Sequence, residues 1–129
     1  MLAFVYGSLK KGYGNNAVLG DSRLEGDATI SGNISLLSLG SFPGLIKNDY
    51  DHAVVTGEVY NINDATLARL DQLEGNGHFY QREEKDVIMG NGAVRKAHVY
   101  FLLPTYYGER NTPSAPSSVS PEGVTTYRW

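Results

Sequence analysis

Alternation of apolar and polar residues predicts most of the regular structure in this chain. Residues 2–6 form a continuous apolar run that stops at Gly7, which is typical of a central strand covered on both faces. Residues 28–39 alternate apolar and polar side chains with the period of a half-buried strand. Residues 54–62 predict another strand, and Gly57 within it indicates a bulge or a close backbone approach. The first half of the chain is therefore expected to be rich in strands.

A single convincing helix follows these strands. Asp64 has the short carboxylate of an N-cap, residues 65–74 favour helix, and Gly75 is a natural stop. Earlier in the chain, residues 10–16 follow the first predicted strand. They are polar and rich in glycine, which predicts a loop.

Two further strands are expected after the helix. Residues 81–89 and 94–103 have strand-like composition, and Gly90-Asn91-Gly92 between them is a strong hairpin signal. Several strands with one helix predict an α+β domain built on a small, curved, mixed β-sheet or barrel.

Composition narrows the classes of function. The 129 residues suffice for one buried core, and the chain has no cysteine, which excludes disulfides, thiolate metal sites and a cysteine nucleophile. Lys and Arg number 11 against 14 for Asp and Glu, without the clustered basic face that nucleic-acid binding needs. The N-terminus carries no signal-peptide or membrane-span pattern, so a cytoplasmic protein is expected.

The C-terminal part of the chain has a different composition. Four prolines and many Ser and Thr lie in residues 104–129, so we predict a domain over residues 1–103 followed by an extension that completes no sheet and is dispensable for chemistry. Tyr127 and Trp129 are exceptions, because aromatic side chains can anchor such a tail.

Two carboxylates are expected on the core-facing side of the helix. Helical spacing aligns Asp71 and Glu74 with Leu67 and Leu70. Glu74 lies in the last turn, near Asp71 and partly desolvated, so its pKa should be raised toward the range of a general base. A solvated acidic pair is the alternative interpretation.

A second candidate feature is the turn after the first strand. The small residues of Tyr6-Gly7-Ser8-Leu9 leave backbone N–H groups free to hold an anionic oxygen, and Gly7 is expected to supply the unusual backbone freedom that only glycine has. Tyr6 is either a core aromatic residue or faces the ligand, and both interpretations stay open. Ser8 lacks a recognisable base partner, which disfavours a serine nucleophile.

Other polar residues have structural explanations. Arg82 lies two residues from Tyr80 on one strand face and is expected to brace Asp71 or Glu74, with a substrate carboxylate as the alternative partner. No metal site is predicted, because the three histidines are scattered outside any ligand motif: His52, His78 and His98.

These motifs together resemble the gamma-glutamylcyclotransferase-like (AIG2-like) family, and in particular its short gamma-glutamylamine cyclotransferase branch. The turn Tyr6-Gly7-Ser8-Leu9-Lys10 matches the opening motif of the family. Further landmarks follow in order: Phe42-Pro43-Gly44-Leu45, Gly57-Glu58-Val59-Tyr60, Leu70-Asp71 through Glu74, Tyr80-Gln81-Arg82 and Val99-Tyr100. Leu73 departs from the aromatic residue common in that branch.

The resemblance implies an enzyme that needs no cofactor. It would release 5-oxoproline from a small-molecule gamma-glutamyl amine, with Glu74 as the catalytic acid/base. Tyr6, Gly7, Ser8 and Leu9 would bind the substrate, and Tyr100 would line the pocket. A non-catalytic module that binds an amino-acid-like molecule is the alternative, and the oligomeric state is not predicted.

Overall fold

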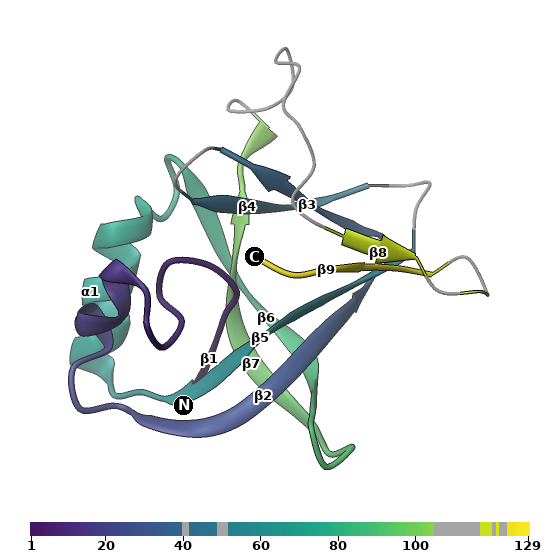
Figure 1. The fold of residues 1–129 in the computed structure, drawn as a ribbon. Coiled ribbons are helices and arrows are strands. Elements are labelled where there is room, and N and C mark those ends of the chain that lie inside the picture. Colours follow the sequence, from purple (N-terminus) through teal and green to yellow (C-terminus); the bar gives the residue numbers. More distant parts are fainter. Residues whose placement is uncertain (40–41, 49–51, 105–116, 120, 122–123) are drawn as a thin grey trace.

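The centre of the molecule is a ring of five strands that closes on itself (Figure 1). The computed structural model describes residues 1–39, 42–48, 52–104, 117–119, 121 and 124–129. Around the ring each strand pairs with the next, and the fifth pairs again with the first: β1 (Leu2–Val5), β7 (Val94–Leu102), β6 (Tyr80–Met89), β2 (Arg23–Gly32) and β5 (Ala53–Asn61). The predicted α+β barrel is confirmed.

Gly57 allows the ring to close tightly. A Cβ at this position would lie 2.5 Å from the carbonyl oxygen of Val5 and 2.7 Å from Cζ of Phe4. The close approach expected at Gly57 is therefore confirmed, and its register with Ala28 is regular. The irregularity in this pair of strands lies instead between Leu24 and Gly26.

The strand predicted over residues 28–39 is in fact two strands. β2 begins at Arg23 and ends at Gly32, and after Asn33 the chain continues as β3 (Ile34–Ser38). β3 pairs with β4 (Pro43–Lys47) in a separate two-stranded sheet. The alternation of side chains continues across the break, so the pattern alone does not reveal that the chain changes sheets.

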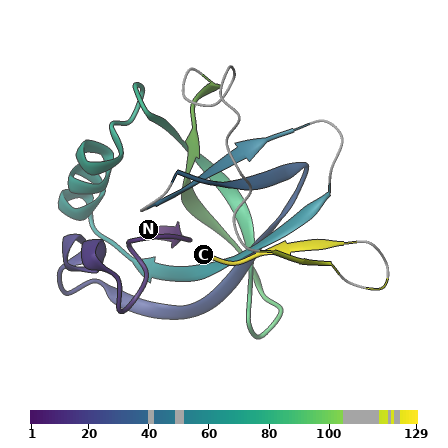
Figure 2. The same ribbon diagram turned by 45° about the horizontal axis from the view of Figure 1, so that its top comes forward.

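Two helices lie side by side on one flank of the barrel: η1 (Gly14–Leu19), a 3-10 helix, and α1 (Asp64–Glu74) (Figures 1 and 2). The predicted loop over residues 10–16 thus runs into η1. The N-cap of α1 is Asn63, not Asp64, and its Oδ1 accepts from the Thr66 N–H at 2.8 Å. Gly75 ends α1 in the left-handed conformation, as predicted.

The core has two layers. The inner layer fills the barrel and includes Phe4, Val55, Val59 and Val99, each exposed by 1% or less. The outer layer packs the helices and β4 against the barrel around the fully buried Leu70.

The C-terminal segment adds strands to the sheet, contrary to the prediction that it completes none. β9 (Thr125–Tyr127) pairs in parallel with residues 53–55 of β5, and β8 (Ser117–Val119) pairs with β9. The proline-rich residues 105–116 lie outside the described part of the chain. None of the helices in the described ranges has the length and apolar character needed to span a bilayer.

We expect Tyr127→Ala to lower the free energy of unfolding by about 3 kcal/mol, because Tyr127 is 8% exposed and packs in the barrel core. Urea denaturation measures the change. Val119→Ala, on the neighbouring strand and 66% exposed, is the control and should change it by less than about 0.5 kcal/mol. Equal midpoints for Tyr127→Ala and wild type would mean that β9 does not contribute to the core.

Candidate active site

A cavity of about 550 Å³ lies where the chain leaves β1 and where α1 ends. All six residues predicted for the site line it: Tyr6, Gly7, Ser8, Leu9, Glu74 and Tyr100. The turn after β1 supplies the first four, α1 supplies Glu74, and β7 supplies Tyr100. Residues that are 94 positions apart in the sequence therefore meet at one cavity.

The turn after β1, which lines this cavity, has main-chain donors without an acceptor among the described residues. Its carbonyl groups are engaged, since Gly7 O accepts from the Lys10 N–H and Ser8 O from the Asn15 N–H, each at 3.0 Å. Within the described residues, the N–H groups of Gly7, Ser8 and Leu9 donate no hydrogen bond. Three consecutive free donors form a place for an anionic oxygen.

Gly7 is required for a steric reason. A Cβ at this position would lie 2.6 Å from both Cγ and Cδ of Pro43. Its φ angle is not positive, so the expectation that Gly7 supplies unusual backbone freedom is wrong. The absence of a side chain lets β4 close over the turn.

Glu74 is the carboxylic acid among the described residues that line the cavity. Burial raises the pKa of its carboxyl from 4.5 to about 7. The predicted direction is confirmed, and burial is the cause. A group with this pKa exchanges protons readily near neutral pH.

Asp71, one turn earlier, has a different environment. Its Oδ1 accepts from the Tyr100 hydroxyl at 2.6 Å and lies 2.9 Å from Nε of Arg82. Nη1 of Arg82 also lies 3.2 Å from Nδ1 of His98. The structure thus favours the bracing role of Arg82 and assigns it to Asp71.

The hydroxyl groups of two buried tyrosines, Tyr6 and Tyr80, connect the walls of the cavity by hydrogen bonds. The Tyr6 hydroxyl donates to Tyr100 O at 2.7 Å and accepts from the Leu45 N–H at 3.2 Å. The Tyr80 hydroxyl donates to Pro43 O at 2.8 Å. Burial, with the nearby negative charge of Glu74, raises the pKa of Tyr6 and of Tyr80, so both stay neutral donors. Tyr6 is therefore both a core residue and part of the cavity wall.

Sequence reasoning missed part of the lining. Tyr80, Phe42 and Leu73 line the cavity; all three belong to the family motifs, but those motifs do not indicate that they face the cavity. Phe79 also lines it and stands outside the motifs, so no local signal marks it.

Alternative chemistries find little support. Ser8 Oγ accepts from Asn15 Nδ2 at 2.9 Å, and no histidine is among the described residues that line the cavity. The described residues contain no group of three His, Asp or Glu side chains placed to hold a metal ion.

Comparison with known proteins shows the family of the chain. The family model described as "Gamma-glutamyl cyclotransferase, AIG2-like" matches residues 3–119. The chain belongs to this family.

Curated relatives within the gamma-glutamylcyclotransferase family cover most of the chain. The family protein YtfP of Escherichia coli K12 is 43% identical over 83 residues, which are 64% of this chain and 70% of that protein. A putative gamma-glutamylcyclotransferase of Vibrio cholerae is 38% identical over 93 residues, or 72% of this chain and 78% of its own length.

Solved structures of the same family share the fold. An AIG2-like protein from Mus musculus superimposes with a TM-score of 0.76 at 27% identity, covering 99% of this chain and 93% of that one. The solution structure of Escherichia coli ytfP gives a TM-score of 0.56 at 38% identity, covering 80% and 83%.

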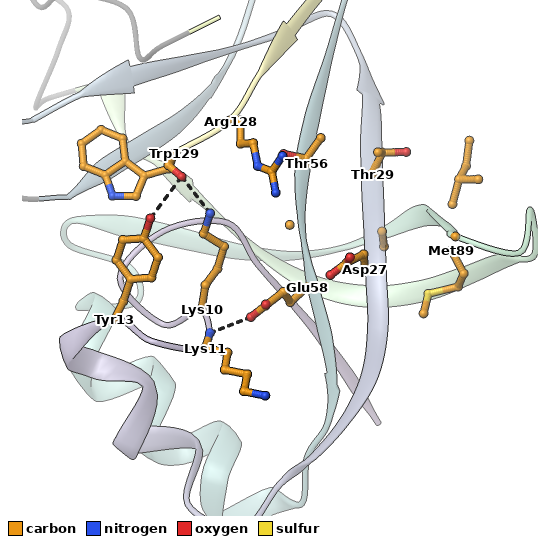
Figure 3. A pocket seen from close by; sticks show the side chains of 14 residues that line it. Lys10, Lys11, Tyr13, Asp27, Thr29, Thr56, Glu58, Met89, Arg128 and Trp129 are labelled. Carbon is orange, nitrogen blue, oxygen red and sulfur yellow. Dashed lines mark hydrogen bonds between the residues drawn. The ribbon is translucent and has the colours of Figure 1, made fainter.

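In this family member the C-terminal segment contacts the loop that follows the turn. Nζ of Lys10 donates to Trp129 O at 2.9 Å, and the Tyr13 hydroxyl donates to the same oxygen at 3.4 Å (Figure 3). These residues border a second cavity of about 480 Å³, which Lys11 and Glu58 also line. There Glu58 Oε1 accepts from the Lys11 N–H at 2.7 Å. The tail is thus connected to the candidate site through the loop that follows the turn.

The contact between Gly7 and Pro43 can be tested by a double-mutant cycle. Gly7→Ala should lower the free energy of unfolding by about 1 to 3 kcal/mol, because the methyl group overlaps the proline ring. Pro43→Ala removes Cγ and Cδ, so the double variant should be more stable than the sum of the single effects predicts by at least about 1 kcal/mol. Additive effects would show that the two residues do not clash.

The raised pKa of Glu74 predicts a pH dependence of stability. Between pH 4.5 and 7 the folded carboxyl binds more protons than the unfolded one, so its stabilising contribution is full below pH 4.5 and is lost as the pH rises through 7. Glu74→Gln removes this loss. Its stability relative to wild type should therefore increase by about 1 to 3 kcal/mol from pH 5 to pH 8 in urea titrations. A constant difference would contradict the burial of the charge.

Proposed function

We propose that this protein is a gamma-glutamylamine cyclotransferase, which converts a gamma-glutamyl amine to 5-oxoproline and the free amine. The observation that supports it most is the pairing in one cavity of Glu74, whose pKa is about 7, with three free N–H groups of the turn. Family membership supports the same class of reaction.

The reaction is an intramolecular aminolysis. The α-amine of the glutamyl group attacks its own γ-carbonyl carbon, forming a C–N bond and closing a five-membered ring. The bond to the amine then breaks, and no water is consumed. Because both reacting groups belong to one molecule, the cavity has only to hold the ring-closing conformation and stabilise charge.

Each group in the cavity has a task in this scheme. Glu74 takes a proton from the α-ammonium group and delivers it to the departing nitrogen, and the second proton that the ring nitrogen sheds also passes to the amine, which leaves as an ammonium ion. The N–H groups of Gly7, Ser8 and Leu9 hold either the α-carboxylate or the oxygen that becomes negative during attack. Tyr6 and Tyr100 form the wall that folds the glutamyl chain, and no cofactor takes part.

Glu74→Gln should lower the release of 5-oxoproline from a gamma-glutamyl amine by about 10²-fold or more, because the amide keeps the shape but accepts no proton. Chromatography of 5-oxoproline measures turnover. Glu84→Gln, a glutamate whose side chain is 63% exposed, is the matched control and should keep wild-type activity.

Two outcomes would contradict the proposal. Equal turnover by Glu74→Gln and wild type would remove Glu74 from the mechanism. Calorimetric binding of 5-oxoproline by a wild-type protein that turns over no gamma-glutamyl amide would favour the non-catalytic binding module.

A further inference from the structure

Three apolar side chains, called here the apolar mouth, line the candidate site and stay partly exposed, alongside the exposed lining residues Tyr13, Gly14 and Asn15. Phe42, Leu73 and Phe79 all line the cavity, yet 43%, 43% and 49% of their surfaces remain exposed. They come from three separate segments: the residue before β4, the last turn of α1 and the residue before β6. Exposed apolar residues that converge on one cavity, rather than being scattered, indicate a binding surface.

This apolar mouth is held in place by the main chain. The Phe79 N–H donates to Gly75 O at 2.9 Å, and Phe79 O accepts from the Leu103 N–H at 2.9 Å. Phe42 O accepts from the Leu39 N–H at 2.9 Å, and Leu73 is part of α1. The main chain that carries these side chains is therefore fixed by its own hydrogen bonds, which lowers the entropic cost of binding.

The charges of the cavity limit what can bind there. Among the described residues that line it, Glu74 is the one charged side chain. In the proposed reaction Glu74 and the free N–H groups serve the ammonium, carboxylate and carbonyl of the glutamyl part. No charged group of the described lining remains for the amine part of the substrate, which therefore meets uncharged side chains, Phe42, Leu73 and Phe79 among them.

We infer that the amine released by this enzyme carries an apolar substituent, an alkyl or aryl chain, which packs against Phe42, Leu73 and Phe79. This inference rests on the proposed function and specifies its substrate class. A charged zwitterionic substituent would lose hydration at this surface without gaining a partner. An apolar one gains from burial in proportion to its area.

A series of synthetic amides tests the inference. Gamma-glutamyl methylamide, propylamide and pentylamide differ only in chain length, and kcat/KM should rise roughly two- to fourfold for each methylene that is buried. Nε-(gamma-glutamyl)lysine has the same five-carbon chain as the pentylamide, with an added ammonium and carboxylate. We expect the pentylamide to be better by about fivefold or more.

Variants locate the effect. Leu73→Ala and Phe79→Ala should reduce the ratio of pentylamide to methylamide efficiency by about fivefold each. Leu24→Ala is the matched control, since Leu24 is 40% exposed but lies outside the cavity. An unchanged ratio in Leu73→Ala and Phe79→Ala would overturn the assignment of the surface.

Binding measurements separate this inference from the proposed function. Calorimetry with Glu74→Gln reports affinity without turnover, and affinity should rise along the same series. If affinity rises while wild type turns over none of the amides, the cyclotransferase proposal fails and the apolar preference stands. Turnover that is equal for all chain lengths, or highest for the lysine adduct, overturns the inference alone.

A second copy of the chain is the competing occupant of the apolar mouth. Sedimentation velocity would then show a dimer that Leu73→Ala and Phe79→Ala weaken, with no dependence of kcat/KM on chain length. That combination would also overturn the inference.

Discussion

The carboxylate of Asp71 joins α1 to the barrel, and the geometry of the site depends on this joint. One oxygen receives the Tyr100 hydroxyl from β7 and faces the guanidinium of Arg82 from β6. Leu70, fully buried beside it, packs the same helix face against the outer core layer. Together the polar contacts of Asp71 and the packing of Leu70 fix the rotation of α1 about its axis and its position along the barrel. Glu74, one turn further on, is placed at the cavity as a result.

Asp71 and Glu74 show how two carboxylates on one helix face acquire different roles. Asp71 has a cation and a hydroxyl donor, so its charge is compensated within the protein. Glu74 is buried without comparable compensation, and its pKa rises to about 7. Separation by a single turn is enough, because Asp71 contacts side chains of β6 and β7 whereas Glu74 lines the cavity. The first carboxylate is structural and the second is free to exchange protons.

Features encoded by neighbouring residues were predictable from the sequence. The helix and its stop at Gly75, the hairpin at Gly90-Asn91-Gly92 and the six cavity residues all carry short-range signals or family motifs. The N-cap was misplaced by one position because Asn63 and Asp64 are both good caps, and only the observed bond to the Thr66 N–H separates them.

Features that depend on long-range pairing were not predictable. Nothing local distinguishes a strand that changes sheets after Asn33 from one that continues. The parallel pairing of β9 with β5 joins segments about 70 residues apart, and composition suggested the opposite. The steric demand at Gly7 likewise arises from Pro43, a residue of another sheet. In each case the partner, rather than the segment itself, decides the outcome.

The edge of β5 is shared between two strands that approach from opposite ends. β1 covers residues 58–61 and β9 covers residues 53–55, so the turn after β1 departs where the two strands meet. This arrangement leaves β5 no long run of unpaired main-chain groups onto which a foreign strand could add. It also sets a fixed total length for the two strands: a longer first strand would require a shorter last one. Among family members in which both strands pair with this edge of β5, the length of the first strand and the length of the last strand should therefore vary together.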